Sequence, residues 1–500
     1  MALKDLREFV ALLERKGQLK RVSAEVDPYL EIGEITDRVS KDFGPALLFD
    51  KPVARESGRA YDHPVAINLF GTYDRMAWAL GVDAETGTWR DLDAVGRKLM
   101  ELLPLDAPAS VWDKLGVMKN LAGLAGVGKK EIKGSKAPCQ EVVLRGSDVD
   151  LTSLPVLTTW PEDGGPFVTL PLVVTSNLKG RHNVGMYRLQ VFGPNETGLH
   201  IHTHHDGAKN MREWAAAGHD KMPVSVALGG DPATIFSATA PVPPIIDEYL
   251  FSGIIRGEAV EVVKCVTNDL LVPAHAEMVL EGWVSTNPED VRWEGPFGDH
   301  TGYYSLADYY PVFHVEAITM RRDAMYPTTI VGQPPMEDCY LGKATERLFL
   351  PVIKAMMPEV IDYDLPLEGV FHNCAIFQIR KEFAGQAFRV MNFAWSMGQM
   401  MFTKYVIVVD EDVDCHNYSE VAWRCFNNVD PDRSLLISKG PLDQLDHSSR
   451  YERFGFKMGI DATKPLPEEG GHTREWPEAM RMTPEVKARV DEMWGEFGLG

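Results

Sequence analysis

A β-rich region covering roughly residues 140–320 constrains the fold more than any other feature of the chain. Runs such as PFVTLPLVVTS, NVGMYRLQVFG, AEMVLEGWV and VFHVEAITM are rich in β-branched and aromatic residues, and turn residues separate them. One helical stretch, about residues 208–217, interrupts the series. The pattern predicts a largely antiparallel sheet or barrel at the centre of the protein.

Helical and strand-like runs alternate on both sides of this region. DLREFVALLERKG has the apolar spacing of a helix, and the last third alternates helices with strands such as KYVIVVD, which favours parallel pairing. A chain of 500 residues is expected to form two or three domains. We therefore predict an α+β multidomain protein, with an N-terminal α/β domain (1–112), a linker helix and loop (113–138), a β domain (139–322) and a C-terminal α/β oligomerisation domain (323–500).

The linker contains a near match to a phosphate-binding loop. Gly123 and Gly128-Lys129 have the required spacing, but Lys130 stands where a Ser or Thr should hold magnesium. We therefore interpret this segment as a linker between domains and not as a phosphate-binding loop.

Composition restricts the partners and the compartment. The net charge of −21 argues against nucleic acid, because phosphate binding needs clustered Lys and Arg. The first 21 residues lack the apolar core of a signal peptide, no apolar run is long enough for a membrane span, and the six cysteines are scattered without a C-x-x-C pair. These features predict a cytoplasmic protein.

Four histidines gather in TGLHIHTHHDGA, residues 197–208. If the segment is extended, His200, His202 and His204 share one face and His205 points the other way. Three imidazoles on one face would suit zinc, whereas a polar strand that binds an anion or pairs its histidines would look the same. The residues alone leave both interpretations open.

Two further segments carry groups suited to catalysis. In NVGMYR, the spacing of Asn183 and Arg188 puts their side chains on opposite faces of a straight strand, and Arg188 alone resembles a surface ion-pair residue. In WEGPFGDHTGYY, Glu294 and Asp299 lie among glycines and aromatic residues. Two neighbouring carboxylates repel each other, which can raise the pKa of one of them. That group would then stay protonated and could act as a proton donor. The acidic run DEDVDCH (410–416) is interpreted as a solvated loop.

In order and spacing, RHNVGMYR, the His-rich segment and EGPFGDHTGYY resemble the UbiD family of decarboxylases. DLREFVALLERKGQLKR, LTTWPEDGGPFVTLPLV and VALGGDPATI do so too, and the resemblance covers nearly the whole chain. GQPPMEDCYLGKATERLFLPVIK is most similar to the branch of menaquinone-biosynthesis and 3-polyprenyl-4-hydroxybenzoate decarboxylases.

The resemblance implies a flavin-reductase-like split β-barrel that binds prenylated FMN, supplied by a flavin prenyltransferase. It implies a divalent ion, Mn²⁺ or Mg²⁺, held by Asn183, His204 and Glu248, with K⁺ or Na⁺ alongside. It also implies that Arg188, Glu294 and Asp299 are catalytic, with Asp299 as proton donor. The residues expected around the cofactor are Met186, Tyr187, Arg188, His200, Ile201, His202, His205 and Asp206.

The resemblance implies a homodimer or homohexamer that decarboxylates a small aromatic acid of the hydroxybenzoate or naphthoate type of quinone biosynthesis, in a reaction that some members of the family also reverse. A catabolic aryl or heteroaryl acid is the alternative substrate, and the chain departs from its relatives at His200, His202 and His205. Two other hypotheses are a zinc hydrolase built on the His200–His205 cluster and a non-catalytic flavin-binding protein of the same fold.

Overall fold

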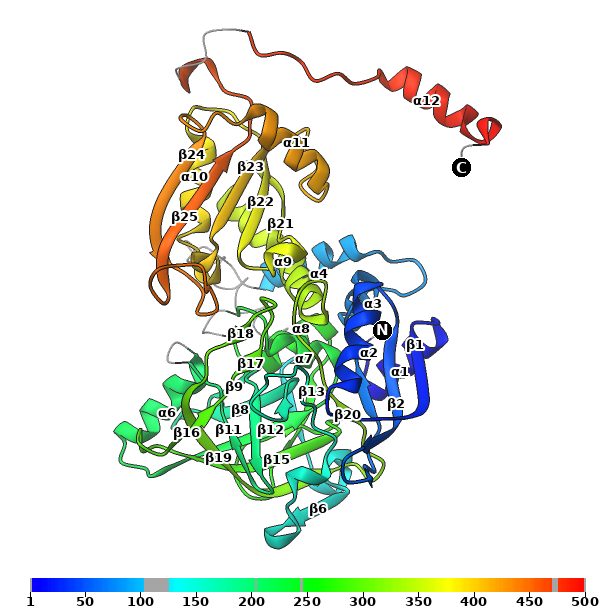
Figure 1. Ribbon diagram of the computed structural model, residues 1–500, viewed down its shortest axis with the longest axis vertical. Helices are drawn as coiled ribbons and strands as arrows, with labels where there is room; N and C mark the ends of the chain where they lie inside the picture. Colours follow the sequence, from blue (N-terminus) through cyan, green and yellow to red (C-terminus); the bar gives the residue numbers. More distant parts are fainter. Residues whose placement is uncertain (1, 103–125, 203–204, 243–245, 470–474, 499–500) are drawn as a thin grey trace.

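The computed structural model describes residues 2–102, 126–202, 205–242, 246–469 and 475–498. A central sheet of antiparallel strands occupies the lower part of Figure 1, an N-terminal α/β unit lies beside it, and a C-terminal α/β unit lies above. Helix α9 (Glu337–Met356) runs between the central and C-terminal units. This arrangement confirms the predicted α+β fold class.

The N-terminal unit begins with the predicted helix, α1 (Leu6–Arg15). The side chain of Asp5 accepts a hydrogen bond from the Glu8 amide and caps the helix, while its apolar face is buried. The other elements are β1 (Leu19–Val26), α2 (Glu31–Lys41), β2 (Ala46–Ala54), β3 (Arg59–Ala60), β4 (Val65–Ile67), α3 (Tyr73–Ala79) and α4 (Leu92–Leu102). Their sheet has the order β1-β2-β4-β20, and β20 (Tyr326–Pro327) comes from the far end of the central region, so the two units share this sheet.

Part of the predicted linker, residues 113–125, lies outside the described residues. Within the rest, Lys129–Ile132 forms strand β5, which pairs in parallel with β13 (Val260–Lys264), whose other neighbour is β14 (Leu271–Pro273). Lys129 and Lys130 therefore lie in a strand and not at the start of a helix, where a phosphate-binding loop would place them.

The central sheet has ten strands, and its main path runs β7-β10-β11-β19-β15-β12-β8-β9. All of its pairings are antiparallel, as predicted. Its strands are β6 (Val142–Arg145), β7 (Phe167–Val168), β8 (Pro171–Ser176), β9 (His182–Gly185), β10 (Leu189–Gly193), β11 (Glu196–Gly198), β12 (Lys221–Leu228), β15 (Met278–Ser285), β16 (Val291–Glu294) and β19 (Asp308–Met320). The helices α6 (Asp206–Ala216), α7 (Pro232–Ser237) and α8 (Glu248–Arg256) and the hairpin β17 (Phe297–Gly298) and β18 (Tyr304–Ser305) lie between these strands in the chain.

Strands β15 and β19 approach very closely at Gly282, where the pairing register shifts. A Cβ atom on Gly282 would lie 1.8 Å from the carbonyl oxygen of His314, and that oxygen belongs to backbone that cannot rotate away. We expect Gly282→Ala to lower the free energy of unfolding by about 2 kcal/mol or more, as overpacking does. Urea unfolding measures this, with Gly193→Ala as the control, because a Cβ there meets nothing within 4 Å.

The C-terminal unit contains a mixed sheet of order β21-β22-β23-β25-β24. Its three inner strands are parallel, as the alternation of helices and strands predicted, and both edge strands are antiparallel to their neighbours. The elements are β21 (Val360–Asp364), β22 (Cys374–Ile379), α10 (Gln386–Ala394), β23 (Tyr405–Asp410), α11 (Tyr418–Asn428), β24 (Leu435–Pro441), β25 (Phe454–Asp461) and α12 (Pro484–Met493).

One long apolar run of this unit forms two separate helical segments. The apolar run 385–402 is not a single helix, because α10 ends at Ala394 and a separate turn of 3-10 helix spans Gly398–Phe402. Gly398 has a φ of 45°, which a continuing right-handed helix cannot accommodate. Among the described residues, no helix is long and apolar enough to cross a membrane.

Candidate active site

A cavity of about 580 Å³ opens between the central sheet and the C-terminal unit. The central region contributes the end of β9, the segment before β10, the histidines after β11 and the start of α8. The C-terminal unit contributes side chains that close the other wall, among them Phe371, Gln399, Phe402, Asp443 and Arg453. Its size is within the range of small-molecule and cofactor sites.

Arg188 is the centre of a buried ion-pair cluster on the wall of this cavity. Its Nη1 donates to Asp299 Oδ2 at 2.5 Å, its Nε donates to Glu294 Oε1 at 3.3 Å, and its Nη2 donates to Ser305 Oγ at 3.1 Å. The guanidinium also lies over the ring of Phe297, 4.5 Å from its centroid. Arg188 thus contacts both of the other residues predicted to be catalytic, although up to 111 positions separate it from them in the chain.

Asp299 is ionised in this arrangement. Burial alone would raise the pKa of this carboxyl, but the hydrogen bond with His300 and the charge of Arg188 hold the pKa well below its usual range. A carboxylate in this state accepts hydrogen bonds and does not donate a proton. Asp299 can act as an acid only after the pairing with Arg188 changes.

His200 reaches the same cluster from the other side. Its backbone amide donates to the carbonyl of Arg188 at 3.1 Å, and its Nδ1 lies 2.7 Å from Glu294 Oε1. Its Nε2 lies 3.1 Å from Nε2 of His202, and its ring packs 4.2 Å from that of Tyr310. Burial lowers the pKa of His200, so the ring is neutral near pH 7. It links Glu294 to His202, which also lines the cavity.

Strand β11 ends at Gly198, so His200, His202 and His205 lie beyond it. The amide of His205 donates to the carbonyl of His202 at 3.0 Å, and the amide of His202 lies 3.1 Å from Nδ1 of His205. His202 and His205 therefore lie close together, and the His205 ring stacks on Tyr187 at 4.8 Å. His204, a predicted metal ligand, lies outside the described residues. Among the described residues, neither His200 nor His202 belongs to a group of three side chains placed to hold a metal ion.

The other two predicted metal ligands lie together at one end of the cavity. Glu248 is the first residue of α8, and its Oε2 accepts a hydrogen bond of 2.9 Å from the amide of Val184, next to Asn183 on β9. Burial raises the pKa of Glu248 to about 7. A partly buried carboxylate beside an amide side chain is an oxygen-rich corner that fits Mn²⁺ or Mg²⁺.

The residues expected to hold the cofactor mostly line this cavity. Those in its wall are Met186, Tyr187, Arg188, His200, His202, His205 and Asp206. Among the described residues of that set, Ile201 is the exception, because its side chain is buried in the hydrophobic core. Asn183 and Arg188 line the same cavity and not opposite faces, because β9 ends at Gly185 and the straight strand stops before Arg188.

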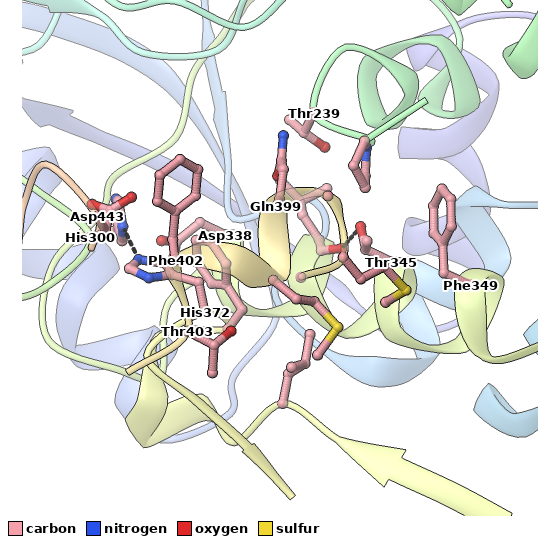
Figure 2. A pocket seen from close by; sticks show the side chains of 18 of the residues that line it. Thr239, His300, Asp338, Thr345, Phe349, His372, Gln399, Phe402, Thr403 and Asp443 are labelled. Carbon is pink, nitrogen blue, oxygen red and sulfur yellow. Dashed lines mark hydrogen bonds between the residues drawn. The ribbon is translucent and has the colours of Figure 1, made fainter. Parts of the chain in front are cut away.

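A second, apolar cavity of about 520 Å³ adjoins the first and extends along α9 (Figure 2). The two share wall residues, including Met186, His300 and Asp338. Both carboxylate oxygens of Asp338 are buried without a hydrogen-bond partner, and burial raises the pKa of this group to about 7. Sequence analysis did not single out Asp338, Ser305 or His372, since no local pattern shows that α9, β18 and the C-terminal unit meet here.

Three family models match successive parts of the chain. They are the N-terminal (residues 10–95), Rift-related (130–334) and C-terminal (339–462) domains of 3-octaprenyl-4-hydroxybenzoate carboxy-lyase. An uncharacterized protein of Archaeoglobus fulgidus is 46% identical over 502 residues, which cover 99% of each chain.

Solved structures show the same architecture. Vanillic acid decarboxylase of Sedimentibacter hydroxybenzoicus, in closed form, is 29% identical, with a TM-score of 0.83 and 99% of each chain covered. The UbiD-class enzyme HmfF of Pelotomaculum thermopropionicum, in complex with FMN, is 30% identical, with a TM-score of 0.78 and 95% of this chain and 97% of that chain covered.

The half-barrel sheet and the buried arginine with its two carboxylates define an enzyme of the carboxy-lyase class. The chain belongs to the UbiD family, as the three matched domains and the full-length relative show.

Proposed function

We propose that this protein is a prenylated-FMN-dependent decarboxylase of an aromatic carboxylic acid. The observation that carries the proposal is the contact of Arg188 with both Glu294 and Asp299 on the cavity wall. One group can bind a carboxylate and another can return a proton, which are the two tasks that any decarboxylase must perform.

The cavity residues fit the cofactor. HmfF has been solved with FMN, and an evolved dimeric form of it with prenylated FMN. Met186, Tyr187 and His205 would hold the flavin, and Asn183, His204 and Glu248 would hold the divalent ion, with K⁺ or Na⁺ alongside. When bound, prenylated FMN supplies an electrophilic electron sink for the electron pair left on the substrate as CO₂ departs.

Arg188 would orient the substrate carboxylate by a two-pronged contact. Its donors are already engaged by Glu294, Asp299 and Ser305, so an incoming carboxylate must displace one of them. Displacement of Asp299 from Arg188 would serve the reaction, because it would free this carboxylate to become a proton donor. Once its ion pair with Arg188 is lost, burial raises its pKa, and it can take up the proton that the product carbon needs.

Glu294 would keep Arg188 in place during this exchange. Its Oε1 accepts from both Arg188 and His200, and its side chain is fully buried. His200 is neutral, so it can donate Nδ1–H to Glu294 without adding a charge to the site.

The relatives favour an aryl acid of catabolism over a precursor of quinone biosynthesis. Vanillic acid decarboxylase of Sedimentibacter hydroxybenzoicus is among the solved relatives that cover 99% of this chain. The quinone-pathway substrate is the second candidate, because the apolar cavity along α9 offers space for a bulky apolar substituent. A panel of both substrate types separates them.

The test is anaerobic CO₂ release by protein co-produced with a flavin prenyltransferase. The proposal expects flavin absorbance and release from at least one aryl acid in a panel of vanillate-like, heteroaryl and naphthoate acids. Bound flavin without release from any acid would support a non-catalytic flavin-binding protein. Ester or amide hydrolysis without flavin would support the hydrolase. Gel filtration of the same sample tests the proposed homodimer or homohexamer.

Glu248→Gln tests the proposed metal corner. The substitution keeps the size of the side chain but removes the charge that would hold the divalent ion. We expect Mn²⁺ affinity and bound flavin to fall at least about tenfold, measured by metal analysis and by the flavin absorbance of the purified protein. Glu258→Gln, two residues beyond the end of α8 and largely exposed, is the matched control. Full retention of both metal and flavin would remove Glu248 from the site.

A further inference from the structure

A second group of metal-ligand side chains lies where the central and C-terminal units meet. His300 follows β17, whereas His372 and Asp443 belong to the C-terminal unit, in the segments before β22 and after β24. One ligand atom from each lies within 4.8 Å of the others, and the two Nε2 atoms are 2.8 Å apart. Figure 2 shows all three at one end of the apolar cavity, with Phe349 at the other.

The ring of His300 is held as metal-ligating histidines usually are. Its Nδ1 lies 3.1 Å from Asp299 Oδ1, and its face stacks on Phe371 at 5.2 Å. A carboxylate that accepts from Nδ1–H leaves the Nε2 lone pair free to bind a cation, and such carboxylate–histidine pairs commonly support bound metals. The tautomer that the Asp299 contact favours is therefore the one that a metal requires.

The second imidazole faces the same point in space. Nε2 of His372 is directed at Nε2 of His300, and its Nδ1 is buried without a hydrogen-bond partner. Two imidazoles that meet through Nε2 can share only one proton between them, whereas a cation would use both lone pairs. Tetrahedral coordination with bonds of about 2.0–2.1 Å needs the two nitrogens roughly 3.3 Å apart, so a shift of about half an ångström suffices.

Carboxylates complete the surroundings. Asp443 supplies the third ligand. The charges of Asp338 and Asp443 both favour positive charge at His300. Asp338 is buried in the cavity wall, and neither of its oxygens has a hydrogen-bond partner. Asp443 Oδ1 accepts a hydrogen bond of 2.8 Å from the amide of Leu445, and the negative charge of this carboxylate beside two imidazoles would favour a divalent cation.

We propose that His300 Nε2, His372 Nε2 and the carboxylate of Asp443 bind a divalent cation of the zinc type. Two imidazoles and one carboxylate form a three-ligand set with a fourth position open, here toward the cavity. This set is richer in nitrogen than the corner at Asn183 and Glu248, so the two sites should select different metals. Because the ligands come from two units, the cation would hold the C-terminal unit against the central sheet.

The proposal does not rest on decarboxylation, and the test needs no substrate. Zn²⁺ is titrated calorimetrically into the full-length protein, and Co²⁺ is added separately to read its visible absorption. We expect one equivalent of Zn²⁺ and a tetrahedral Co²⁺ spectrum, both retained in Glu248→Gln. His372→Ala and, as a milder change, Asp443→Asn should each weaken binding at least tenfold, whereas His219→Ala, an exposed histidine on the central unit, should not.

Two results would overturn the proposal. One is the absence of stoichiometric Zn²⁺ binding to a folded protein, which would leave a plain hydrogen bond between the two histidines. The other is unchanged affinity in both His372→Ala and Asp443→Asn, which would place the ion elsewhere. Circular dichroism of each variant shows that it is folded, and neither result bears on CO₂ release.

Discussion

Replacing Asp299 with Asn should abolish CO₂ release while the cofactor stays bound. The amide has nearly the same shape and can still contact Arg188 and His300, but it cannot carry the proton that the product carbon needs. A positioned acid contributes about 10²–10⁴-fold to a rate, so turnover should fall by at least this lower limit. Anaerobic CO₂ release and the flavin absorbance of the same preparation measure the two effects separately.

The control for this variant is Asp308→Asn. Asp308 is exposed at the start of β19, opposite Glu294 in the strand pairing but outside the ion-pair cluster. It should leave turnover within about twofold. Unchanged CO₂ release in Asp299→Asn would instead point to Asp338, the buried carboxyl in the adjoining wall whose pKa burial raises to about 7. In that case Asp338→Asn should be the inactive variant.

Local sequence patterns predicted the elements well, and the contacts between them poorly. Runs of β-branched and aromatic residues separated by turn residues identified the antiparallel strands, and the helical spacing of apolar residues identified α1, because these signals depend on near neighbours. Arg188 illustrates the limit. Its own surroundings indicated a surface ion pair, and only resemblance to a family connected it with Glu294, 106 residues away.

The acidic run 410–416 illustrates the same limit in the other direction. It was interpreted as a solvated loop, but Cys415 is buried, and His416 lies 2.8 Å from Asp364 and 3.1 Å from Asp362. The sequence of the loop does not show that β21 places two acids against it. No local sequence pattern indicates His372 for the same reason, since its partner His300 is 72 residues away in another unit.

Arg188→Ala should cost both stability and activity. The substitution leaves Glu294, whose side chain is fully buried, and Asp299, which is almost fully buried, without their cation. Breaking a buried pair by removing one partner typically costs about 3–5 kcal/mol, and we expect a loss of this order in chemical unfolding. This variant alone cannot separate a failure of folding from a failure of catalysis, so a second variant is required.

Arg188→Lys makes that separation. Lysine keeps the positive charge between the two carboxylates, so the free energy of unfolding should stay within about 1–2 kcal/mol of the parent. Its compact ammonium lacks the planar fork that reaches Glu294, Asp299 and Ser305 together, and it cannot bind a substrate carboxylate through two parallel hydrogen bonds. Losing one charged hydrogen bond costs about 1.5–3 kcal/mol, so kcat/KM should fall about 10–100-fold in a protein that remains folded.

Arg292→Lys, an exposed position on β16, is the matched control and should change neither quantity. If Arg188→Lys kept full kcat/KM, only the charge at this position would matter, and the two-pronged contact proposed for the substrate would be wrong.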